Sequence, residues 1–258
     1  MPPAGYLLGA PQTKEPPLKR CYAFFDGQNL YHSARKVFGC AWPDYDPLLL
    51  SAKVCRDKDW NLIKVLFYTG IPDRHENPFW NRFWVNKLAA MGTRGVRTYS
   101  RTVKNNREKG IDLRLEIDVV RMAITNQYDV ALIFSQDQDF TEAVETVKEI
   151  ARLQNRWIWV ASAFPYNPMI KRSAGIMGTE MIRIDKTLYD ACIDPAEGVG
   201  GDYACLRLMH AGHMQLGLRV CLCANPCNLP SSESNLLTIM SKKDVSLRSY
   251  LRKTAYAT

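Results

Sequence analysis

The chain has 258 residues, 47% hydrophobic and 23% charged, a balance typical of a soluble globular protein large enough to bury a core. It carries 34 Lys and Arg residues against 26 Asp and Glu, and the net charge of +8 favours an anionic partner, with nucleic acid first among the candidates. No stretch approaches the roughly 20 uninterrupted apolar residues of a membrane-spanning helix, so the composition argues against a membrane protein.

Residues 1–19 are rich in proline, and their apolar run is too short for a secretory signal, so we expect a flexible lead. The chain has eight cysteines, and four of them are widely scattered, at Cys21, Cys40, Cys55 and Cys192. This scatter suggests reduced thiols more than a disulfide framework. We therefore expect a cytoplasmic protein.

The first predicted strand is the short apolar run 21–25, and an acid, Asp26, follows it directly. Gly27 is expected to permit a tight turn. Apolar residues spaced over 30–38 then predict a helix. An ordinary helix cap would explain Asp26 equally well at this point.

The next elements are a short helix near 47–55, a strand over 62–68, a helix over 78–91 and a short edge-like strand over 95–99. Aromatic side chains cluster in the helix over 78–91. Stacking on nucleic-acid bases is one use of such aromatics, but their i,i+4 spacing favours core packing.

The passage 94–109 is strongly basic, with six Lys or Arg residues against the single Glu108. Such a run is usually a solvated loop, yet this one leads directly into a further acid, so phosphate binding is an equal alternative. The candidates for phosphate contact are Arg101, Lys104, Arg107 and Lys109.

Asp112 opens the predicted helix over 111–123, where a first-turn acid is also favoured by the helix dipole. Asp118 lies about a turn and a half further along. It does not share a line with Asp112 on a regular helix, so we rank it below the other acids.

The run 130–134 is short, contiguous and apolar, as in a strand buried on both faces of a parallel sheet. Asp137 and Asp139 follow its carboxyl end, where open α/β sheets bind ligands. Asp139 with Glu142 three residues later also matches a capping box at the start of the helix over 140–152. For Asp137 a functional role is favoured, because a second acid in the same loop repels the first unless a cation lies between them.

Further strands are predicted at 157–161 and 181–184, with 170–176 connecting them. The alternation of strands and helices predicts an α/β fold with a parallel sheet covered on both faces. Residues 195–258 have no assignable fold. The histidines and cysteines of this segment do not match paired zinc-ligand spacings, so no zinc site is expected there.

Asp26, Asp112, Asp137 and Asp139 are all predicted at one edge of the sheet or at adjoining helix starts. Several carboxylates in one cleft do not all stay ionised without a cation among them. Hard oxygen ligands of this kind suit Mg²⁺ or Mn²⁺.

Three motifs in order, FDGQN at 25–29, KGID at 109–112 and SQDQDF at 135–140, resemble the NYN domain of the LabA-like group within the PIN-like nuclease superfamily. The resemblance spans about residues 20–190 and implies a PIN-like three-layer α/β/α sandwich with a mostly parallel central sheet. Gln138 stands where the family usually has a small residue, and Gln136 replaces a frequent glycine.

The resemblance implies divalent-metal-dependent ribonuclease chemistry, with Mg²⁺ or Mn²⁺ held by the same four aspartates. It also implies that Asn29 orients the first acid and that Ser135 shapes the last motif. We expect an NYN nuclease domain over 20–194 and a C-terminal extension over 195–258. Single-stranded RNA is the expected partner, and a homodimer is left open.

Two alternatives stay open. The apolar strand followed by DQDFT also resembles the opening of haloacid-dehalogenase-type phosphatases, in which the first Asp is a nucleophile. That reading leaves Asp26 and Asp112 unexplained. The other alternative is a non-catalytic RNA-binding or regulatory module on the same fold.

Overall fold

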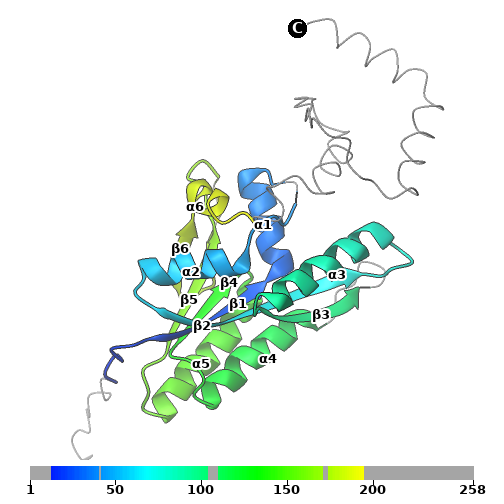
Figure 1. Cartoon of the computed structure of the whole chain (residues 1–258). Coiled ribbons are helices and arrows are strands. Elements are labelled where there is room, and N and C mark those ends of the chain that lie inside the picture. The colour runs from blue at the N-terminus through cyan, green and yellow to red at the C-terminus, as the bar shows by residue number, and fades with distance from the viewer. Residues whose placement is uncertain (1–12, 41, 104–109, 171–173, 195–258) are drawn as a thin grey trace, which may run out of the picture. The chain divides into compact units, whose positions relative to one another are not determined.

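The structure of the protein is a computed structural model, which describes residues 13–40, 42–103, 110–170 and 174–194 (Figure 1). Its strands are β1 (Arg20–Asp26), β2 (Asn61–Pro72), β3 (Arg97–Val103), β4 (Val130–Phe134), β5 (Trp159–Pro165) and β6 (Glu180–Ile184). Its α-helices are α1 (Gly27–Phe38), α2 (Pro47–Asp57), α3 (Pro78–Thr93), α4 (Ile111–Ile124), α5 (Thr141–Leu153) and α6 (Lys186–Asp190), and a 3₁₀ turn, η1, covers Gln138–Phe140.

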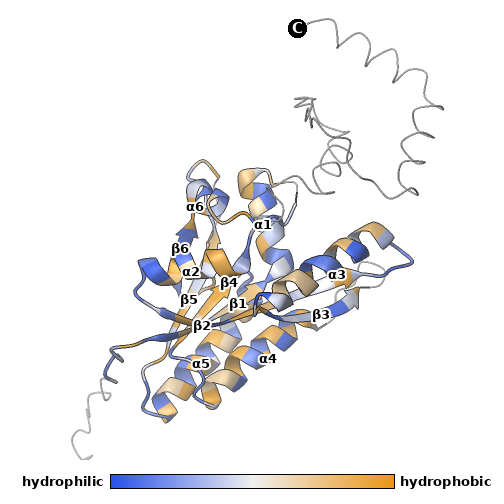
Figure 2. Cartoon of the chain, in the orientation of Figure 1, coloured by the Kyte–Doolittle hydropathy of each residue, from blue (hydrophilic) through white to orange (hydrophobic). Residues whose placement is uncertain are grey.

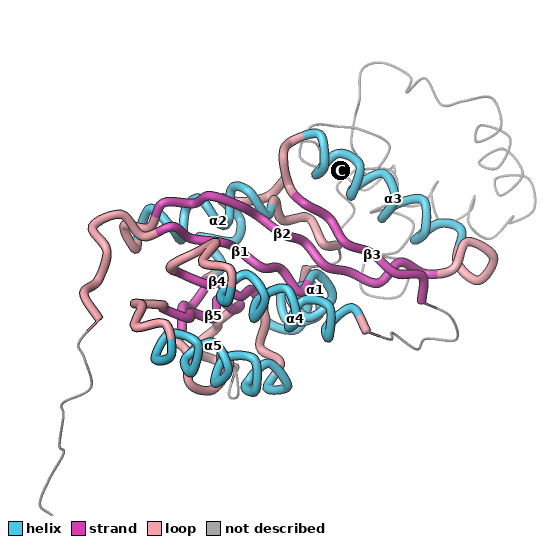
Figure 3. Tube along the Cα trace, turned by 90° about the horizontal axis from the view of Figure 1, so that it is seen from below, coloured by secondary structure: helices cyan, strands magenta, loops and turns pink. Residues whose placement is uncertain are grey.

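The six strands form one sheet in the order β3-β2-β1-β4-β5-β6, and every pairing is parallel. Figure 3 shows β3, β2, β1, β4 and β5 following one another in this order. The chain first builds outward from β1 through β2 to β3, and then returns to the other side of β1 with β4. The order therefore reverses between β1 and β4. In open α/β sheets the crevice outside the carboxyl ends at such a reversal is the usual ligand site.

Two hydrophobic cores lie on the two faces of the sheet, because alternate residues of each strand point to opposite sides. Phe25 of β1 packs on the face covered by α1, α2 and α3, whereas Phe24 packs on the face covered by α4 and α5. Figure 1 shows these helix layers above and below the sheet, and Figure 2 shows hydrophobic colouring in the middle of it. The predicted PIN-like α/β/α fold is confirmed, and the described sheet is wholly parallel.

The connection between β5 and β6 differs from the predicted alternation. Its described parts, 166–170 and 174–179, are turns and loop without a helix. Pro168 disfavours a continuous helix because it lacks a backbone N–H, and Gly178 disfavours one because its φ is +79°. The strand predicted at 157–161 begins instead at Trp159, where its pairing with Val130 begins.

The aromatic cluster of α3 packs in the core, as predicted. Phe83 and Trp84 are buried, while Phe79 and Trp80 pack against the same core. Trp42 completes the cluster, with its ring centroid 5.0 Å from that of Trp80. The packing of these rings therefore holds α3 against the sheet.

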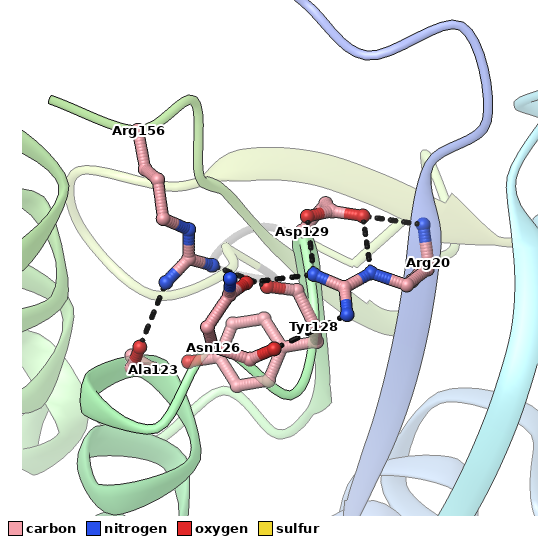
Figure 4. A network of polar contacts seen from close by, with 6 residues as sticks. All are labelled: Arg20, Ala123, Asn126, Tyr128, Asp129 and Arg156. Carbon is pink, nitrogen blue, oxygen red and sulfur yellow. Dashed lines mark hydrogen bonds and ion pairs between the residues drawn. The ribbon is translucent and has the colours of Figure 1, made fainter. Parts of the chain in front are cut away.

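A charged network joins β1 to β4 at the amino edge of the sheet (Figure 4). The guanidinium of Arg20 donates to both carboxylate oxygens of Asp129, at 2.9 Å each, and its backbone N–H donates to Oδ2 at 3.0 Å. Arg20 also donates to the backbone and side-chain oxygens of Asn126. Burial acts to raise the pKa of Asp129, but the hydrogen bonds from Arg20 outweigh burial and hold that pKa below its ordinary value.

The last described residues close against the loop before α2. The backbone N–H of Asp46 donates to the carbonyl oxygen of Cys192 at 2.7 Å, and the backbone N–H of Asp194 donates to the carbonyl oxygen of Asp44 at 2.7 Å. The folded unit thus includes the chain up to residue 194. Within the described ranges, no helix has both the length and the apolar character needed to cross a bilayer.

Candidate functional site

The carboxyl ends of β1 and β4 bring the first and last acidic motifs together. Phe25 pairs with Phe134 in the register of these strands, so the next residues, Asp26 and Ser135, lie side by side. Asp26 caps α1 by accepting the backbone N–H of Asn29 at Oδ1, 3.0 Å away. Its other oxygen, Oδ2, accepts the hydroxyl of Ser135 at 3.1 Å.

A relay of hydrogen bonds continues from Ser135 through the acidic loop. The backbone N–H of Asp137 donates to Ser135 Oγ at 3.1 Å, and the backbone N–H of Asp139 donates to Asp137 Oδ1 at 3.1 Å. Asp26 is buried, Asp137 is half-buried and Asp139 is exposed. The burial of the three aspartates therefore decreases along this series of hydrogen bonds.

The side chain of Asn29 holds the acidic loop. Its Oδ1 accepts the backbone N–H of Gln136 at 3.0 Å, and the Ser33 hydroxyl donates to Gln136 Oε1 at 2.9 Å. The amide of Asn29 thus contacts the last motif, while the hydroxyl of Ser135 contacts the first acid. Each residue links the two motifs across the strand pair.

Gln138 ties the acidic loop to the connection before β6. Its Nε2 donates to the carbonyl oxygens of Gln136 and Gly175, and its Oε1 accepts the backbone N–H of Met177 at 3.1 Å. Both glutamines, which depart from the usual motif, therefore anchor this loop.

Gly27 is needed for close packing and not for an unusual turn, since its φ is not positive. A Cβ at this position would lie 2.5 Å from Phe67 Cζ and 3.0 Å from the carbonyl oxygen of Tyr68. The missing side chain lets the start of α1 approach β2, which keeps Asp26 at the sheet edge.

Asp112 lies in the first turn of α4, on the face of the sheet that α4 and α5 cover. Burial raises the pKa of Asp112 first, and the carboxylates of Asp137 and Asp139 raise it further. The pKa of Glu116 is raised in the same way, by burial and then by Asp112, Asp139 and Asp137. Glu116 is thus a further acid in the field of the group.

The donor chemistry of this group suits a hard divalent cation, because carboxylates that raise one another's pKa are stabilised by a cation among them. As the side chains stand, however, no three acids, histidines or cysteines of the described residues converge closely enough to hold a metal ion. Binding by three of them requires side-chain movement. The ligand type of these residues therefore suits a divalent metal, although the positions of their side chains do not form a metal site without movement.

Comparison with known families decides the assignment. The model of the NYN domain family matches residues 20–163, more than half of the chain. The chain belongs to the NYN domain family. Among solved structures, a protein of unknown function from Vibrio parahaemolyticus is similar at 16% identity and a TM-score of 0.43, covering 67% of this chain and 97% of that chain. No curated protein matches.

The NYN match runs through the DQDFT loop, which favours the nuclease interpretation of that loop over the phosphatase one. The capping-box interpretation of Asp139 is wrong. Helix α5 begins at Thr141 after Phe140 and has no side-chain cap, while Asp137 caps the preceding 3₁₀ turn. NYN domains are generally nucleases that use divalent metals, so the family makes hydrolase chemistry on RNA plausible for this chain.

The predicted basic residues are only partly described. Arg101 lies on β3, and a Cβ on Gly110 would lie 2.8 Å from its Nη1, so its guanidinium reaches the start of α4. Lys104, Arg107 and Lys109 lie outside the described residues, as does the extension 195–258 with the histidines and cysteines considered for zinc.

Asp118 is separate from the acidic group. It is fully buried and accepts hydrogen bonds from Tyr68, Arg114 and Arg121. These three donors give Asp118 a structural role in joining α4 to β2. This role agrees with its low rank among the candidate site acids predicted from the sequence.

Proposed function

We propose that this NYN protein is a divalent-metal-dependent endoribonuclease that hydrolyses RNA phosphodiester bonds at the carboxyl edge of β1 and β4. The observation that carries the proposal is the relay from Asp26 through Ser135 to Asp137, formed where the strand order reverses. Asp112 and Asp139 complete the catalytic set.

Asp26, Asp112, Asp137 and Asp139 would hold Mg²⁺ or Mn²⁺, which supplies charge neutralisation at the scissile phosphate and a more acidic bound water. The protein residues have separate tasks. Asn29 and Ser135 keep the two motifs in register, so the acids approach a phosphate from a fixed platform. Burial and the nearby Asp137 and Asp139 raise the pKa of Asp112, and a cation bound among these acids would lower it again.

The test is cleavage of a labelled single-stranded RNA by the full chain with Mg²⁺, with Mn²⁺ or with EDTA. We compare the unmodified protein with Asp137→Asn, and use Asp57→Asn as the control, since Asp57 is an exposed acid at the end of α2. Cleavage that needs metal and is lost only in Asp137→Asn supports the proposal. RNA binding without cleavage under either metal refutes it and favours a non-catalytic RNA-binding module.

The finer features of the proposal follow the same resemblance. We place the protein in the LabA-like group, with single-stranded RNA as substrate and the cytoplasm as its compartment. The four described cysteines, Cys21, Cys40, Cys55 and Cys192, are free, which is compatible with a reducing compartment. Sedimentation of the full chain would show whether it forms a homodimer.

A further inference from the structure

Apart from the buried Asp118, the charged residues of helix α4 named here lie on two flanks, one acidic and one basic. Asp112 and Glu116 are four residues apart, so they lie on one flank, toward the acidic loop. Arg114 lies roughly 200° around the helix from Asp112, and Arg121 follows on nearly the same line as Arg114. The second flank therefore presents arginines, on the side of the helix toward β3.

Strand β3 adds two arginines to this flank. Arg97, Tyr99 and Arg101 alternate along β3 and so share one face of this edge strand. The Cζ atoms of Arg97 and Arg114 lie 5.2 Å and 5.0 Å from the centroid of the Tyr99 ring. The same ring stacks on Tyr68, with a centroid separation of 5.0 Å and an interplanar angle of 10°. Tyr99 thus gathers two guanidinium groups from two elements.

The charge of the two α4 arginines is only partly offset by carboxylates. Within the described residues, Arg114 and Arg121 both pair with the buried Asp118. Their side chains nevertheless remain 41% and 53% exposed, and Arg97 is exposed on β3. A guanidinium presents five N–H donors in a planar fork, so one carboxylate leaves much of this binding capacity available to an anion.

The arginine group leads to the acids around the start of α4. Gly110 precedes the helix with a φ of +80°, and Arg101 lies against it. Asp112 follows two residues later. The arginines and the acids are therefore nearest to each other at the first turn of α4. The backbone N–H groups of that turn also favour negative charge.

We propose that Arg97, Arg101, Arg114 and Arg121, which we call the β3–α4 arginine lane, bind the sugar–phosphate backbone of the RNA strand that leads away from the acids. The identity of the ligand rests on the proposed function. Arg97 and Arg101 are four residues apart on a strand, roughly 13 Å. This span requires an anion with repeated charges. A polynucleotide meets that requirement and a single phosphate does not.

The test measures binding of a labelled single-stranded RNA to the full chain without divalent metal, between about 50 and 200 mM salt. The test variant is Arg97→Ala with Arg101→Ala, because replacing Arg114 or Arg121 would expose the buried charge of Asp118. The matched control is Arg183→Ala. Arg183 lies on β6, the opposite edge strand, and its Cζ is also close to a tyrosine ring, 4.4 Å from the centroid of Tyr166.

We expect the double variant to bind about tenfold more weakly at low salt, with the slope of log K against log salt reduced by about 1.4, the value for two contacts to a single strand. Arg183→Ala should bind as the unmodified protein does. Arg97→Lys with Arg101→Lys, which keeps both charges, should recover most of the affinity that the double alanine variant loses. Equal melting temperatures would show that the variants are folded.

Unchanged affinity and salt slope in the double variant would overturn the lane, and so would an equal loss in Arg183→Ala, which would indicate general attraction to a basic protein. The outcome is separable from that of the proposed function. Weaker binding by the double variant with no cleavage by the unmodified protein would keep the lane and refute the nuclease. Cleavage by the unmodified protein, with RNA binding unchanged in the double variant, would support the nuclease and refute the lane.

Discussion

Carboxylates at the two ends of the central strand pair have pKa values shifted in opposite directions. At the amino edge, Asp129 accepts three hydrogen bonds from Arg20, and its pKa lies below the ordinary value. At the carboxyl edge, Asp112 and Glu116 are partly buried near other acids, and their pKa values are raised. One end of the β1–β4 pair thus has a satisfied ion pair, whereas the crowded acids of α4 lie near the acidic loop at its other end.

This difference separates stability from reactivity along one pair of strands. A carboxylate held by a bidentate arginine stabilises the folded state but has little capacity left for a ligand. Carboxylates that repel one another cost stability and gain most from an added cation. Variants at the two edges should therefore change different measurable properties.

The largest expected effect is on catalysis at the carboxyl edge. Asp26→Asn keeps the shape of the side chain but removes its charge, and we expect the RNA cleavage rate to fall at least about 100-fold. Asp129→Asn should keep the full rate per folded molecule. Single-turnover cleavage with Mg²⁺ measures both. An equal loss in the two variants would mean that the carboxyl edge has no special role.

The second effect is on stability at the amino edge. Asp129→Asn leaves Arg20 without its bidentate partner, and we expect the free energy of unfolding to fall by about 2 kcal/mol at neutral pH. Because the pKa of Asp129 is lowered in the folded state, this contribution is present at neutral pH and disappears as pH falls through that pKa. Urea unfolding across the acid range measures it, with Asp57→Asn as the exposed control. A cost that does not vary with pH would contradict the charge-based explanation.

The smallest effect has the opposite sign. Since the pKa of Glu116 is raised in the folded state, its ionisation lowers stability above that pKa, and this cost vanishes once pH falls below the ordinary carboxyl range. Glu116→Gln should therefore raise the melting temperature by about 2 °C at neutral pH without metal. The gain should shrink in acid.

Added Mg²⁺ provides the second arm of the Glu116 experiment. It should stabilise the unmodified protein more than Glu116→Gln, so the advantage of the variant narrows or reverses. Thermal unfolding with and without Mg²⁺ tests this. A melting temperature that Mg²⁺ leaves unchanged in the unmodified protein would argue against a cation site among these acids.

Local sequence patterns predicted the layered fold and the positions of Asp26 and Asp137. Contiguous apolar runs mark buried parallel strands, and residues that follow such strands must lie at the carboxyl edge. Glu116 was missed, although its i,i+4 spacing from Asp112 was a usable signal. The hydrogen bond from Gln138 to Gly175 could not be read locally, because the two residues lie 37 positions apart and meet only through the fold.

The role of Gly27 also depended on distant residues. Its sequence setting suggested a turn, whereas its packing against Phe67 is what excludes a side chain. The order in which β4 returns beside β1 was likewise hidden from local patterns, since alternation of strands and helices predicts parallel pairing but not which strands are neighbours.

The pairing of β1 with β4 has a consequence for the newly made protein. Arg20 and Asp129 are separated by 109 positions, so this central pair closes only after a long loop has been ordered. Asp137 is made 111 positions after Asp26, so the two acids cannot lie together until the chain through β4 has been synthesised and paired with β1.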